Sequence, residues 1–506
     1  MTVRTIPAMV DHAMAEFGDR EAIADAGVRW TFAELGSEIY RCAAAMIASG
    51  VQPGDRVAVW ASNSYRFVVA ALGAVTAGAI LVPLNTRFKG EEAAWILGKS
   101  RARLLVVENG FLGNDYVAML AGAAGSDLGG LAEIVRLDRE FDEFLDRGSA
   151  VAPGVVRERA ESVAEGDISD MFFTSGTTGR PKGVLTGHGQ NLRVFDAWAS
   201  GVGLRGGDRY LLVNPMFHTF GYKAGVLACL LRGATMLPLP VFDVASVLRL
   251  VAAERITVLP GAPTLYSSML DHPALAGADV SSLRLAVTGA AVVPVSLIER
   301  MRALLFPEVV IAYGLTETCG TVTVGDPRTD PEVMSRTVGM PLADTEVAIG
   351  DSGEVLVRGY NVMRGYFEDP VATAEAIDAD GWLHTGDVGV FCDDGSLRIT
   401  DRLKDMFVVG GFNSYPAEIE QVITRHSGVS EAAVVGVPDS RLGEVGLAFV
   451  VPRPGSVVSE EEIIGFCRER LANFKVPRAV RFVDTLPRNA SGKVLKYQLR
   501  SAAASA

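Results

Sequence analysis

Short apolar runs alternate with helical stretches along the first third of the chain. The stretch Ile6–Glu16 is predicted to be a helix, and the runs Arg56–Trp60 and Leu104–Val107 are predicted to be buried strands. Thr31, followed by Glu34 three residues later, has the capping-box pattern that opens a helix. Strands and helices in alternation are typical of a doubly wound, mainly parallel sheet, so the pattern predicts an α/β fold.

One long uncharged stretch resembles a membrane-spanning segment. No charged residue occurs between Phe67 and Leu84, but Gly73, Gly78 and Pro83 interrupt the stretch. We therefore expect a buried helix that runs into a buried strand, and no stable insertion into a membrane.

The alternation resumes after residue 174 and predicts a large site. The strand candidates are Tyr210–Val213, Ala234–Leu237, Thr257–Leu259, Leu283–Thr288 and Val309–Ala312. Ligands of α/β sheets collect at the carboxyl ends of the strands. The loops at such ends with glycine and polar residues are Thr174–Gly183, Pro215–Gly221, Thr288–Ala291 and Tyr313–Thr318. We expect them to assemble one site.

From about Gly339 the pattern changes to short β segments separated by turns. These segments are Glu346–Ile349, Glu354–Arg358, Trp382–His384, Val388–Phe391 and Ser396–Thr400, and they predict a small antiparallel barrel or sheet. The remaining residues read as a compact α+β unit. The sequence thus predicts a division into an N-terminal domain, residues 1–401, and a C-terminal domain, residues 402–506.

Charge and cysteine usage exclude several classes of protein. The net charge of −13 over 506 residues argues against nucleic acid as a principal partner, which would require a basic surface. The five cysteines are scattered and odd in number, so neither structural zinc nor a disulfide framework is expected. This usage favours a cytoplasmic location.

The loop Thr174–Gly183 concentrates groups that bind phosphate. It follows the apolar strand Asp170–Phe173 and has the sequence TSGTTGRPKG, in which glycine amides, hydroxyls and one lysine suit a polyphosphate. Arg-Pro stands between Gly179 and Lys182, so the spacing is not that of a Walker A loop. A triphosphate cradle is the prediction, and a mobile polar turn is the alternative.

Two further motifs suit a nucleotide. In Tyr313-Gly-Leu-Thr-Glu-Thr, Tyr313 is able to stack on a purine, Thr316 to bond a phosphate and Glu317 to hold Mg²⁺. The alternative is a helix terminus with ordinary caps. In His384-Thr-Gly-Asp387, a carboxylate after a tight turn is able to accept hydrogen bonds from both hydroxyls of a ribose. A simple turn residue is the alternative for Asp387.

Two basic residues near the end of the chain complete the set. Arg402 lies in TDRLKD at the proposed domain junction, where a salt-bridged linker is the alternative. Lys493 lies on a glycine turn in PRNASGK and is able to neutralise charge that develops on an α-phosphate. A solvated tail residue is the alternative for Lys493.

Together these runs resemble the adenylate-forming superfamily, which includes acyl-CoA synthetases, luciferases and nonribosomal adenylation domains. The phosphate loop, YGLTET, HTGD, TDRLKD, GGFNSYPAEIE and PRNASGK occur in the family's order and span nearly the full length. The resemblance implies a large N-terminal domain with two mainly parallel sheets flanked by helices plus a small β-barrel, and a small mobile α+β C-terminal domain.

The resemblance also implies roles for individual residues. The phosphates of ATP would contact Thr174, Ser175, Gly176, Thr177, Thr178, Gly179 and Lys182. The adenine would be framed by Gly289, Ala290, Ala291, Tyr313 and Gly314. The remaining ATP contacts would be Thr316 to the α-phosphate, Glu317 to Mg²⁺, and Asp387 and Arg402 to the ribose. The residues expected to be catalytic are Lys493, Glu317, Thr174 and His218, with Lys493 between the acid and the nucleotide.

The implied reaction has two halves, with ATP, Mg²⁺ and coenzyme A as co-substrates and cofactors. A carboxylic acid and ATP give acyl-AMP and pyrophosphate. The C-terminal domain then rotates about Lys404, and Gly410, Gly411 and Phe412 line the channel through which the thiol of CoA displaces AMP. Acid, ATP and CoA are thus the expected partners, and a homodimer is compatible with this family.

The acid is the least constrained part of the prediction. The expected acyl pocket consists of Phe217, His218, Tyr222, Lys223, Gly289 and Gly314. Lys223 is unusual there, and it would either bond a ketone of the acid or lie on a surface helix, while His218 is alternatively a hydrogen-bonded loop residue. Ser414 also departs from the family, which usually has an apolar residue there.

Several loops resemble those of an actinobacterial group that activates the propanoate side chain of a methylated dioxo-hydrindane, a steroid-degradation intermediate. This acid is the leading expectation. The alternatives are a medium- or long-chain fatty acid, and an adenylation enzyme that loads a carrier protein. A kinase would also bind MgATP, but it would release ADP instead of AMP.

Overall fold

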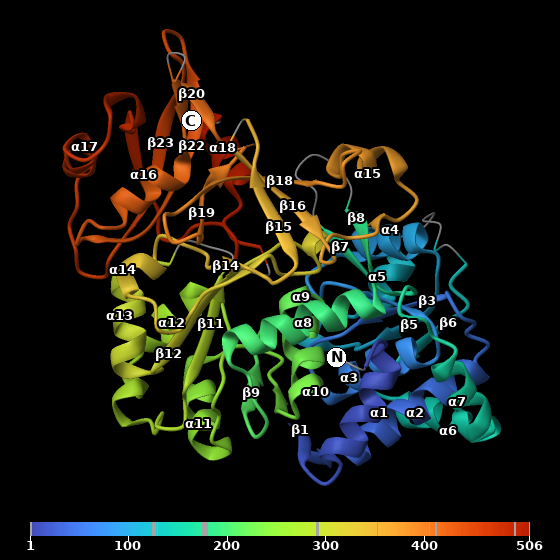
Figure 1. Ribbon diagram of the computed structural model, residues 1–506. Coiled ribbons are helices and arrows are strands. Elements are labelled where there is room, and N and C mark those ends of the chain that lie inside the picture. The colour runs from blue at the N-terminus through green and yellow to red at the C-terminus, as the bar shows by residue number, and fades with distance from the viewer. Residues whose placement is uncertain are drawn as a thin grey trace.

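The chain folds into a large part built on three sheets and a small C-terminal part built on a fourth (Figure 1). The computed structural model describes residues 3–123, 128, 130–174, 181–289, 293–351, 353–403, 405–409, 412–489 and 492–504. Both parts combine strands and helices, which confirms the predicted α/β fold with a smaller α+β unit.

The first sheet has seven strands in the order β17-β8-β7-β4-β3-β5-β6. They are β3 (Arg56–Trp60), β4 (Ile80–Pro83), β5 (Ala102–Val107), β6 (Glu133–Arg136), β7 (Ile168–Thr174), β8 (Lys182–Gly187) and β17 (Gly365–Tyr366). Strands β3 to β7 pair in parallel, whereas β8 and β17 are antiparallel additions at one edge.

Helices cover both faces of this sheet, because successive side chains of a strand point to opposite faces. Val57 and Val59 of β3 pack into the main hydrophobic core, while Ala58 and Trp60 pack into a second core. The helices on the first face are α1 (Ile6–Phe17), α2 (Phe32–Ala48) and α3 (Tyr65–Thr76), and those on the second are α4 (Gly90–Ser100) and α5 (Tyr116–Gly122). Two further helices, α6 (Phe141–Asp146) and α7 (Pro153–Glu161), pack against α2.

Two sequence expectations about the helices are confirmed. The Thr31 side chain accepts a hydrogen bond from the Glu34 N–H while the Glu34 carboxylate binds the Thr31 N–H, so the capping box is present. The uncharged stretch forms α3 and β4, and every residue from Phe67 to Thr76 is buried. Among the described residues, no helix has the length and apolar character needed to cross a membrane.

The second sheet joins two groups of four strands. They are β1 (Glu21–Asp25), β2 (Val28–Thr31), β9 (Arg209–Leu212), β10 (Thr235–Pro238), β11 (Leu285–Gly289), β12 (Glu308–Tyr313), β13 (Thr323–Val324) and β14 (Met340–Pro341). The predicted strand Thr257–Leu259 is reduced to a bridge at Val258, which pairs with Tyr210 and Leu285 and so links the two groups. The pairs β1–β10, β9–β10 and β11–β12 are parallel.

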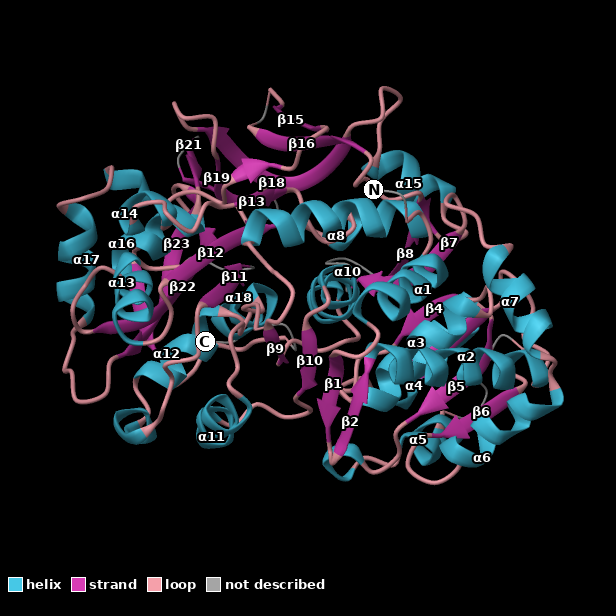
Figure 2. Ribbon diagram, turned by 60° about the horizontal axis from the view of Figure 1, so that its bottom comes forward, coloured by secondary structure: helices cyan, strands magenta, loops and turns pink. Residues whose placement is uncertain are grey.

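Helix α8 (His188–Val202) runs between the two sheets (Figures 1 and 2) and contacts β8 and β13. The main core includes side chains from both sheets, for example Val59 and Tyr210, so the two sheets share one hydrophobic interior. The far face of the second sheet packs on α11 (Val244–Glu254), α12 (Pro263–Leu270) and α13 (Val295–Leu304). The short α10 (Ala228–Arg232) packs against α8.

The third sheet is antiparallel, with the order β15-β16-β18-β19. Its strands are β15 (Thr345–Ile349), β16 (Glu354–Gly359), β18 (Leu383–Phe391) and β19 (Leu397–Arg402). The short helices α14 (Pro331–Met334) and α15 (Pro370–Ala376) lie in the segments that precede and interrupt it. The expected strands Trp382–His384 and Val388–Phe391 form one continuous strand, β18, and the separation predicted from the sequence is wrong.

The C-terminal part has its own core around a five-stranded sheet. Its strands are β20 (Phe407–Val409), β21 (Phe412–Ser414), β22 (Val429–Asp439), β23 (Gly443–Pro452) and β24 (Ala479–Phe482), and its helices are α16 (Pro416–Ile423), α17 (Glu460–Arg468) and α18 (Lys496–Ala504). Arg402 still belongs to β19 of the third sheet. The division at residue 402 stays a prediction.

Candidate active site

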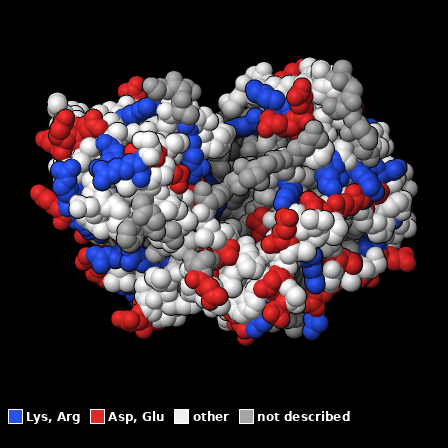
Figure 3. Space-filling model, turned by 90° about the horizontal axis from the view of Figure 1, so that it is seen from above, with Lys and Arg blue, Asp and Glu red and all other residues white. Residues whose placement is uncertain are grey.

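The residues predicted to bind a nucleotide lie at the ends of strands in neighbouring sheets. Thr174 ends β7 and pairs directly with Lys182, which begins β8, so the phosphate loop joins two antiparallel strands as a hairpin. Gly289 ends β11 and Tyr313 ends β12. In the view from above, the surface is hollowed between the large and the small part, and acidic and basic side chains are intermixed on this face (Figure 3).

Part of the predicted site lies outside the described residues. This applies to Ser175, Gly176, Thr177, Thr178, Gly179, Ala290, Ala291, Lys404, Gly410 and Gly411. The backbone of Phe412 is described as part of β21, but its side chain is not. The roles expected for these residues stay predictions.

Two glycines are required by the close approach of backbone segments. A Cβ on Gly289 would lie 2.3 Å from the carbonyl oxygen of Ala312 on the neighbouring strand. A Cβ on Gly314 would lie 2.3 Å from the carbonyl oxygen of Gly320. Because contacts this short do not occur, any side chain at either position would push the loops after β11 and β12 apart.

Tyr313, Asp387 and Arg402 form a hydrogen-bonded group around the buried Asp387 carboxylate. The Tyr313 hydroxyl donates to Asp387 Oδ2 at 2.7 Å, and Arg402 Nε lies 2.9 Å from Asp387 Oδ1. The Asp387 side chain is 3% exposed. Burial, together with the Asp387 carboxylate, raises the pKa of Tyr313 well above its ordinary value, so its hydroxyl remains a donor. This ion pair brings together two residues that the sequence predicted for one ribose.

A β-bulge, and not a tight turn between strands, orients Asp387. The residues Leu356 and Glu354 of β16 pair with His384 and Val388 of β18, so β18 carries extra residues between these two pairs. Gly386 has a φ of 69° inside the bulge, and its N–H binds a carboxylate oxygen of Glu354. A bulge redirects the side chain that follows it, which explains how a strand residue reaches the site.

Tyr366, which the sequence analysis did not identify, lies between Glu317 and Lys182 and contacts both. The Tyr366 hydroxyl donates to Glu317 Oε1 at 3.0 Å, and Lys182 Nζ lies 5.0 Å from the centre of the Tyr366 ring. Tyr366 belongs to the two-residue strand β17 and pairs with Val184 of β8. So short a strand has no recognisable period, and only its glycine-aromatic sequence marks it.

Thr316 and Glu317 begin a 3₁₀ turn, Thr316–Thr318. The Thr318 hydroxyl accepts a hydrogen bond from the Leu315 N–H at 2.9 Å, which is the ordinary helix cap that the sequence offered as an alternative. The cap and the proposed metal role are compatible, because Thr318 supplies the cap while the Glu317 carboxylate faces Tyr366.

Four of the residues expected around the acyl group lie in the segment that follows β9, namely Phe217, His218, Tyr222 and Lys223. His218 precedes the short helix α9 (Thr219–Gly221), and its Nδ1 accepts a hydrogen bond from the Phe220 N–H at 3.3 Å. Burial lowers the pKa of His218 to about 4, so its ring is neutral near pH 7. Phe217 and His218 are half-buried. A role of either residue at the acid stays a prediction.

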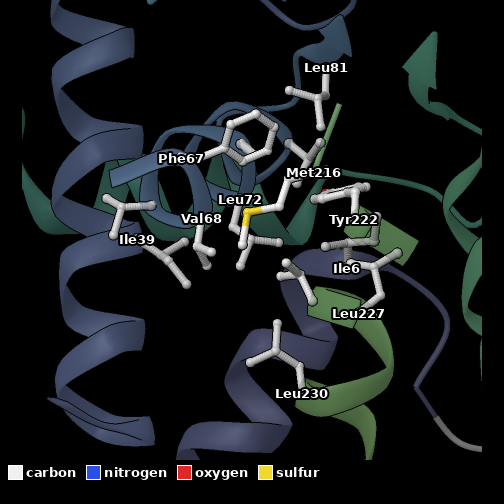
Figure 4. Close-up of a cluster of buried hydrophobic side chains, with 14 of the residues drawn as sticks. Ile6, Ile39, Phe67, Val68, Leu72, Leu81, Met216, Tyr222, Leu227 and Leu230 are labelled. Carbon is white, nitrogen blue, oxygen red and sulfur yellow. The ribbon is translucent and has the colours of Figure 1, made fainter. Parts of the chain in front are cut away.

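Tyr222 is fully buried and points into the main hydrophobic core beside Met216 and Leu227 (Figure 4). Its hydroxyl has no hydrogen-bond partner among the described residues. Tyr222 begins a π-helical turn, Tyr222–Leu227. Its ring lies inside the core, and its contact with the acid stays a prediction.

Lys223 follows Tyr222 in this π-helical turn and is also fully buried. Its ammonium lies 2.9 Å from Asp170 Oδ1 and donates to the Thr186 hydroxyl at 2.7 Å. The alternative of a surface-helix lysine is therefore wrong. The lysine is held by protein groups on β7 and β8.

The loop that carries Lys493 lies against the large part. Gly492 has a φ of 82°, and a Cβ there would lie 3.3 Å from the Cβ of Ala262. Ala262 follows Gly261, whose N–H binds the carbonyl of Val287 in β11. The turn that precedes Lys493 therefore contacts the segment bonded to β11, and the N–H of Lys493 binds the side chain of Asn489.

Comparison with known proteins shows a family that covers almost the whole chain. Residues 10–367 match the family described as AMP-binding enzyme, and residues 418–493 match the AMP-binding enzyme C-terminal domain. A Mycobacterium tuberculosis protein is 53% identical over 98% of this chain and 99% of its own length. It is named a 7a-methyl-1,5-dioxo-octahydro-1H-inden-4-yl propanoyl:CoA ligase.

A Rhodococcus jostii protein with the same name is 52% identical over 98% of this chain and 98% of its own length. Among solved structures, an anthranilate CoA ligase in complex with anthranoyl-AMP superimposes with a TM-score of 0.87. It is 26% identical, and the match covers 100% of this chain and 99% of that chain.

Proposed function

Because the chain belongs to the AMP-binding enzyme family, we propose that it is an ATP-dependent acid–CoA ligase that forms AMP and pyrophosphate. The observation that carries this proposal is the position of the C-terminal loop. Gly492, which precedes Lys493, lies against Ala262 in the loop after Pro260, and this supports a position of Lys493 near the group formed by Tyr313, Asp387 and Arg402. A lysine so placed suits charge that develops between an acid and an α-phosphate.

In the proposed first half-reaction, a carboxylate oxygen of the acid attacks the α-phosphorus of ATP. The bond from the α-phosphorus to the bridging oxygen breaks, and pyrophosphate leaves towards the hairpin between Thr174 and Lys182. In the second half-reaction, the CoA thiol attacks the acyl carbon, loses its proton, and AMP leaves. Positioning and charge stabilisation supply the catalysis, because no covalent enzyme intermediate is needed.

The residues present fit Mg²⁺ bound together with ATP. Mg²⁺ commonly uses one or two protein carboxylates plus phosphate oxygens. Within the described part of the chain, no group of three or more His, Cys, Asp or Glu side chains forms a metal site. Glu317 Oε1 accepts a hydrogen bond from the Tyr366 hydroxyl, which leaves the other carboxylate oxygen for the metal ion.

For the acid we propose the propanoate of a methylated dioxo-hydrindane. The identities of 53% and 52% to ligases named for this acyl group support it, since both matches span essentially whole chains. A relative named as a long-chain fatty-acid–CoA ligase is more distant, at 36% identity. A cytoplasmic location and a homodimer are retained as proposals from the sequence.

The test is a panel of acids assayed for CoA-dependent release of AMP. The panel contains the dioxo-hydrindane propanoate, octanoate, palmitate and anthranilate. We expect AMP, pyrophosphate and the CoA thioester in equal amounts, with kcat/KM highest for the bicyclic acid. Equal or higher kcat/KM for a fatty acid would refute the substrate. Release of ADP would refute the adenylation mechanism.

Free CoA must also be compared with a carrier protein that bears phosphopantetheine. An enzyme that loads a carrier would give AMP with both thiols but a much higher rate with the carrier. We expect the opposite preference, and faster transfer to the carrier would refute the ligase proposal.

A further inference from the structure

A buried polar network lies behind the phosphate hairpin, and the mechanism above does not use it. It consists of Ser169 and Asp170 on β7, Thr186 on β8, Asn191 on α8, Lys223 in the π-helical turn and Cys319 after the 3₁₀ turn. Each of these residues is at most 1% exposed. The network therefore joins three consecutive elements, β7, β8 and α8, to the π-helical turn and to the Cys319 segment, which lie further along the chain.

Every N–H of the Lys223 ammonium has a protein partner. It contacts Asp170 Oδ1 at 2.9 Å, Thr186 Oγ1 at 2.7 Å and Cys319 Sγ at 3.7 Å. Since an ammonium has three donors, no N–H remains for a ketone of the acid. Direct recognition of the substrate by Lys223, as expected from the sequence, would require one of these contacts to break.

The other members of the network are also satisfied. Asp170 Oδ1 accepts from the Thr186 hydroxyl at 2.5 Å, and Asp170 Oδ2 accepts from Ser169 and Asn191 at 2.8 and 2.6 Å. The Cys319 thiol donates to Asn191 Oδ1 at 2.9 Å. A fully satisfied buried network rigidifies the elements that contribute to it.

These elements carry the predicted phosphate and metal contacts. Asp170 and Thr186 face each other across the hairpin, four residues from the facing pair Thr174 and Lys182. At about 3.3 Å per residue, the network lies roughly 13 Å behind the base of the phosphate loop. On the other side, Cys319 follows Glu317 by two residues.

We propose that Lys223 is a positioning residue for adenylation, which fixes the β7–β8 hairpin relative to the Glu317 segment. Its ammonium is bound to both at once, through Asp170 and Thr186 on the hairpin and through Cys319 on the segment. This role depends on the proposed adenylation reaction, because fixing the hairpin relative to the Glu317 segment would align pyrophosphate with the metal ion. The π-helical turn presents Lys223 to both partners, and such turns are frequent at functional sites.

The test uses the full-length protein and three variants. Lys223→Met removes the charge at similar length, and Lys223→Met/Asp170→Asn also removes the carboxylate that would be left without its counter-charge. Arg284→Met is the control, because Arg284 forms an ion pair with the buried Asp208 at the opposite end of β11. Each variant is measured for thermal unfolding, acid-dependent ATP–pyrophosphate exchange, and thioester synthesis from supplied acyl-AMP.

We expect Lys223→Met to slow exchange roughly 10- to 100-fold, the range that misalignment of reactants causes, with the KM for the acid unchanged. Thioester synthesis from acyl-AMP should stay near the wild-type rate. The double variant should regain thermal stability but not exchange activity. Arg284→Met should lose stability but keep wild-type kinetics well below its melting temperature.

Three results would overturn the proposal. They are wild-type exchange in Lys223→Met, an increase confined to the KM of keto acids, and equal loss in both half-reactions. Hydrogen exchange gives a readout that does not need the reaction. Lys223→Met should lower protection in both residues 168–174 and 313–319, and Arg284→Met should not. If the wild type adenylates none of the acids, the proposed function fails, while the hydrogen-exchange result still decides the role of Lys223.

Discussion

Asp387→Asn tests the assignment of the ribose site most directly. A carboxylate offers about four lone-pair positions on its two oxygens. In the structure, Tyr313 occupies one position on Oδ2 of Asp387, and Arg402 occupies one position on Oδ1. One position on each oxygen is left, which matches the two hydroxyls of a ribose. Asparagine keeps one oxygen and replaces the other by an NH₂ donor, so two acceptor positions remain for four donors.

The magnitude follows from this count of donors and acceptors. A hydrogen bond to a charged group contributes about 1.5–3 kcal/mol, and at least one such bond to ATP must be lost in Asp387→Asn. A loss of about 2 kcal/mol corresponds to roughly 30-fold weaker ATP binding. For the same reason, the wild type should bind 2′-deoxy-ATP roughly 30-fold more weakly than ATP. In Asp387→Asn this preference should fall to about threefold or less, since the acceptor for the 2′-hydroxyl is occupied or absent.

The assay is isothermal titration of ATP and 2′-deoxy-ATP into both proteins with the acid absent. Asp208→Asn is the control, because Asp208 is likewise a buried carboxylate that holds an arginine, Arg284, but lies at the other end of the sheet. It should lose stability and keep the wild-type preference for ATP. An unchanged preference in Asp387→Asn would refute the ribose assignment, even if both nucleotides bound more weakly.

Further predictions concern the C-terminal lysine, the hinge and acid stability. Lys493→Ala should abolish pyrophosphate exchange and spare thioester synthesis from acyl-AMP, and equal loss in both assays would contradict its proposed role. Lys404→Pro should spare pyrophosphate release and slow CoA transfer, so an unchanged second half-reaction would exclude the hinge. Burial lowers the pKa of His188 in the folded protein to about 4. As the pH falls below about 6.5, the imidazole is therefore protonated in the unfolded chain before it is protonated in the folded protein, and the unfolding free energy decreases. His188→Asn should therefore remove about 2 kcal/mol of the decrease in unfolding free energy between pH 7 and pH 5, and urea titrations with the same pH dependence in both proteins would contradict this.

Local sequence signals were sufficient where structure depends on near neighbours. The capping box of Thr31 and Glu34 and the buried helix and strand within residues 67–84 follow from spacing and hydrophobicity alone. The chemistry of the motif around Tyr313 can likewise be predicted from the local sequence, because its hydroxyl, carboxylate and aromatic groups lie within a few residues.

Features that depend on distant partners were missed or misplaced. The bulge before Asp387 exists because β18 pairs with β16 on both sides of it, and no local pattern distinguishes it from a turn. Tyr366 reaches Glu317 only through the pairing of β17 with β8. Lys223 was expected at a ligand or in solvent, because its counter-charge Asp170 lies 53 residues earlier in the sequence.

The polar contacts of the molecule separate what should stay fixed from what should move. Asp170 and Lys223 are completely buried, so breaking their ion pair would leave an unpaired charge in the interior. We therefore expect the hairpin to keep its position through both half-reactions. By contrast, Arg500 of α18 and its partner Asp405 both follow Lys404 in the chain. A rotation about Lys404 that withdraws Lys493 would therefore carry this ion pair along intact, while the hairpin keeps its place.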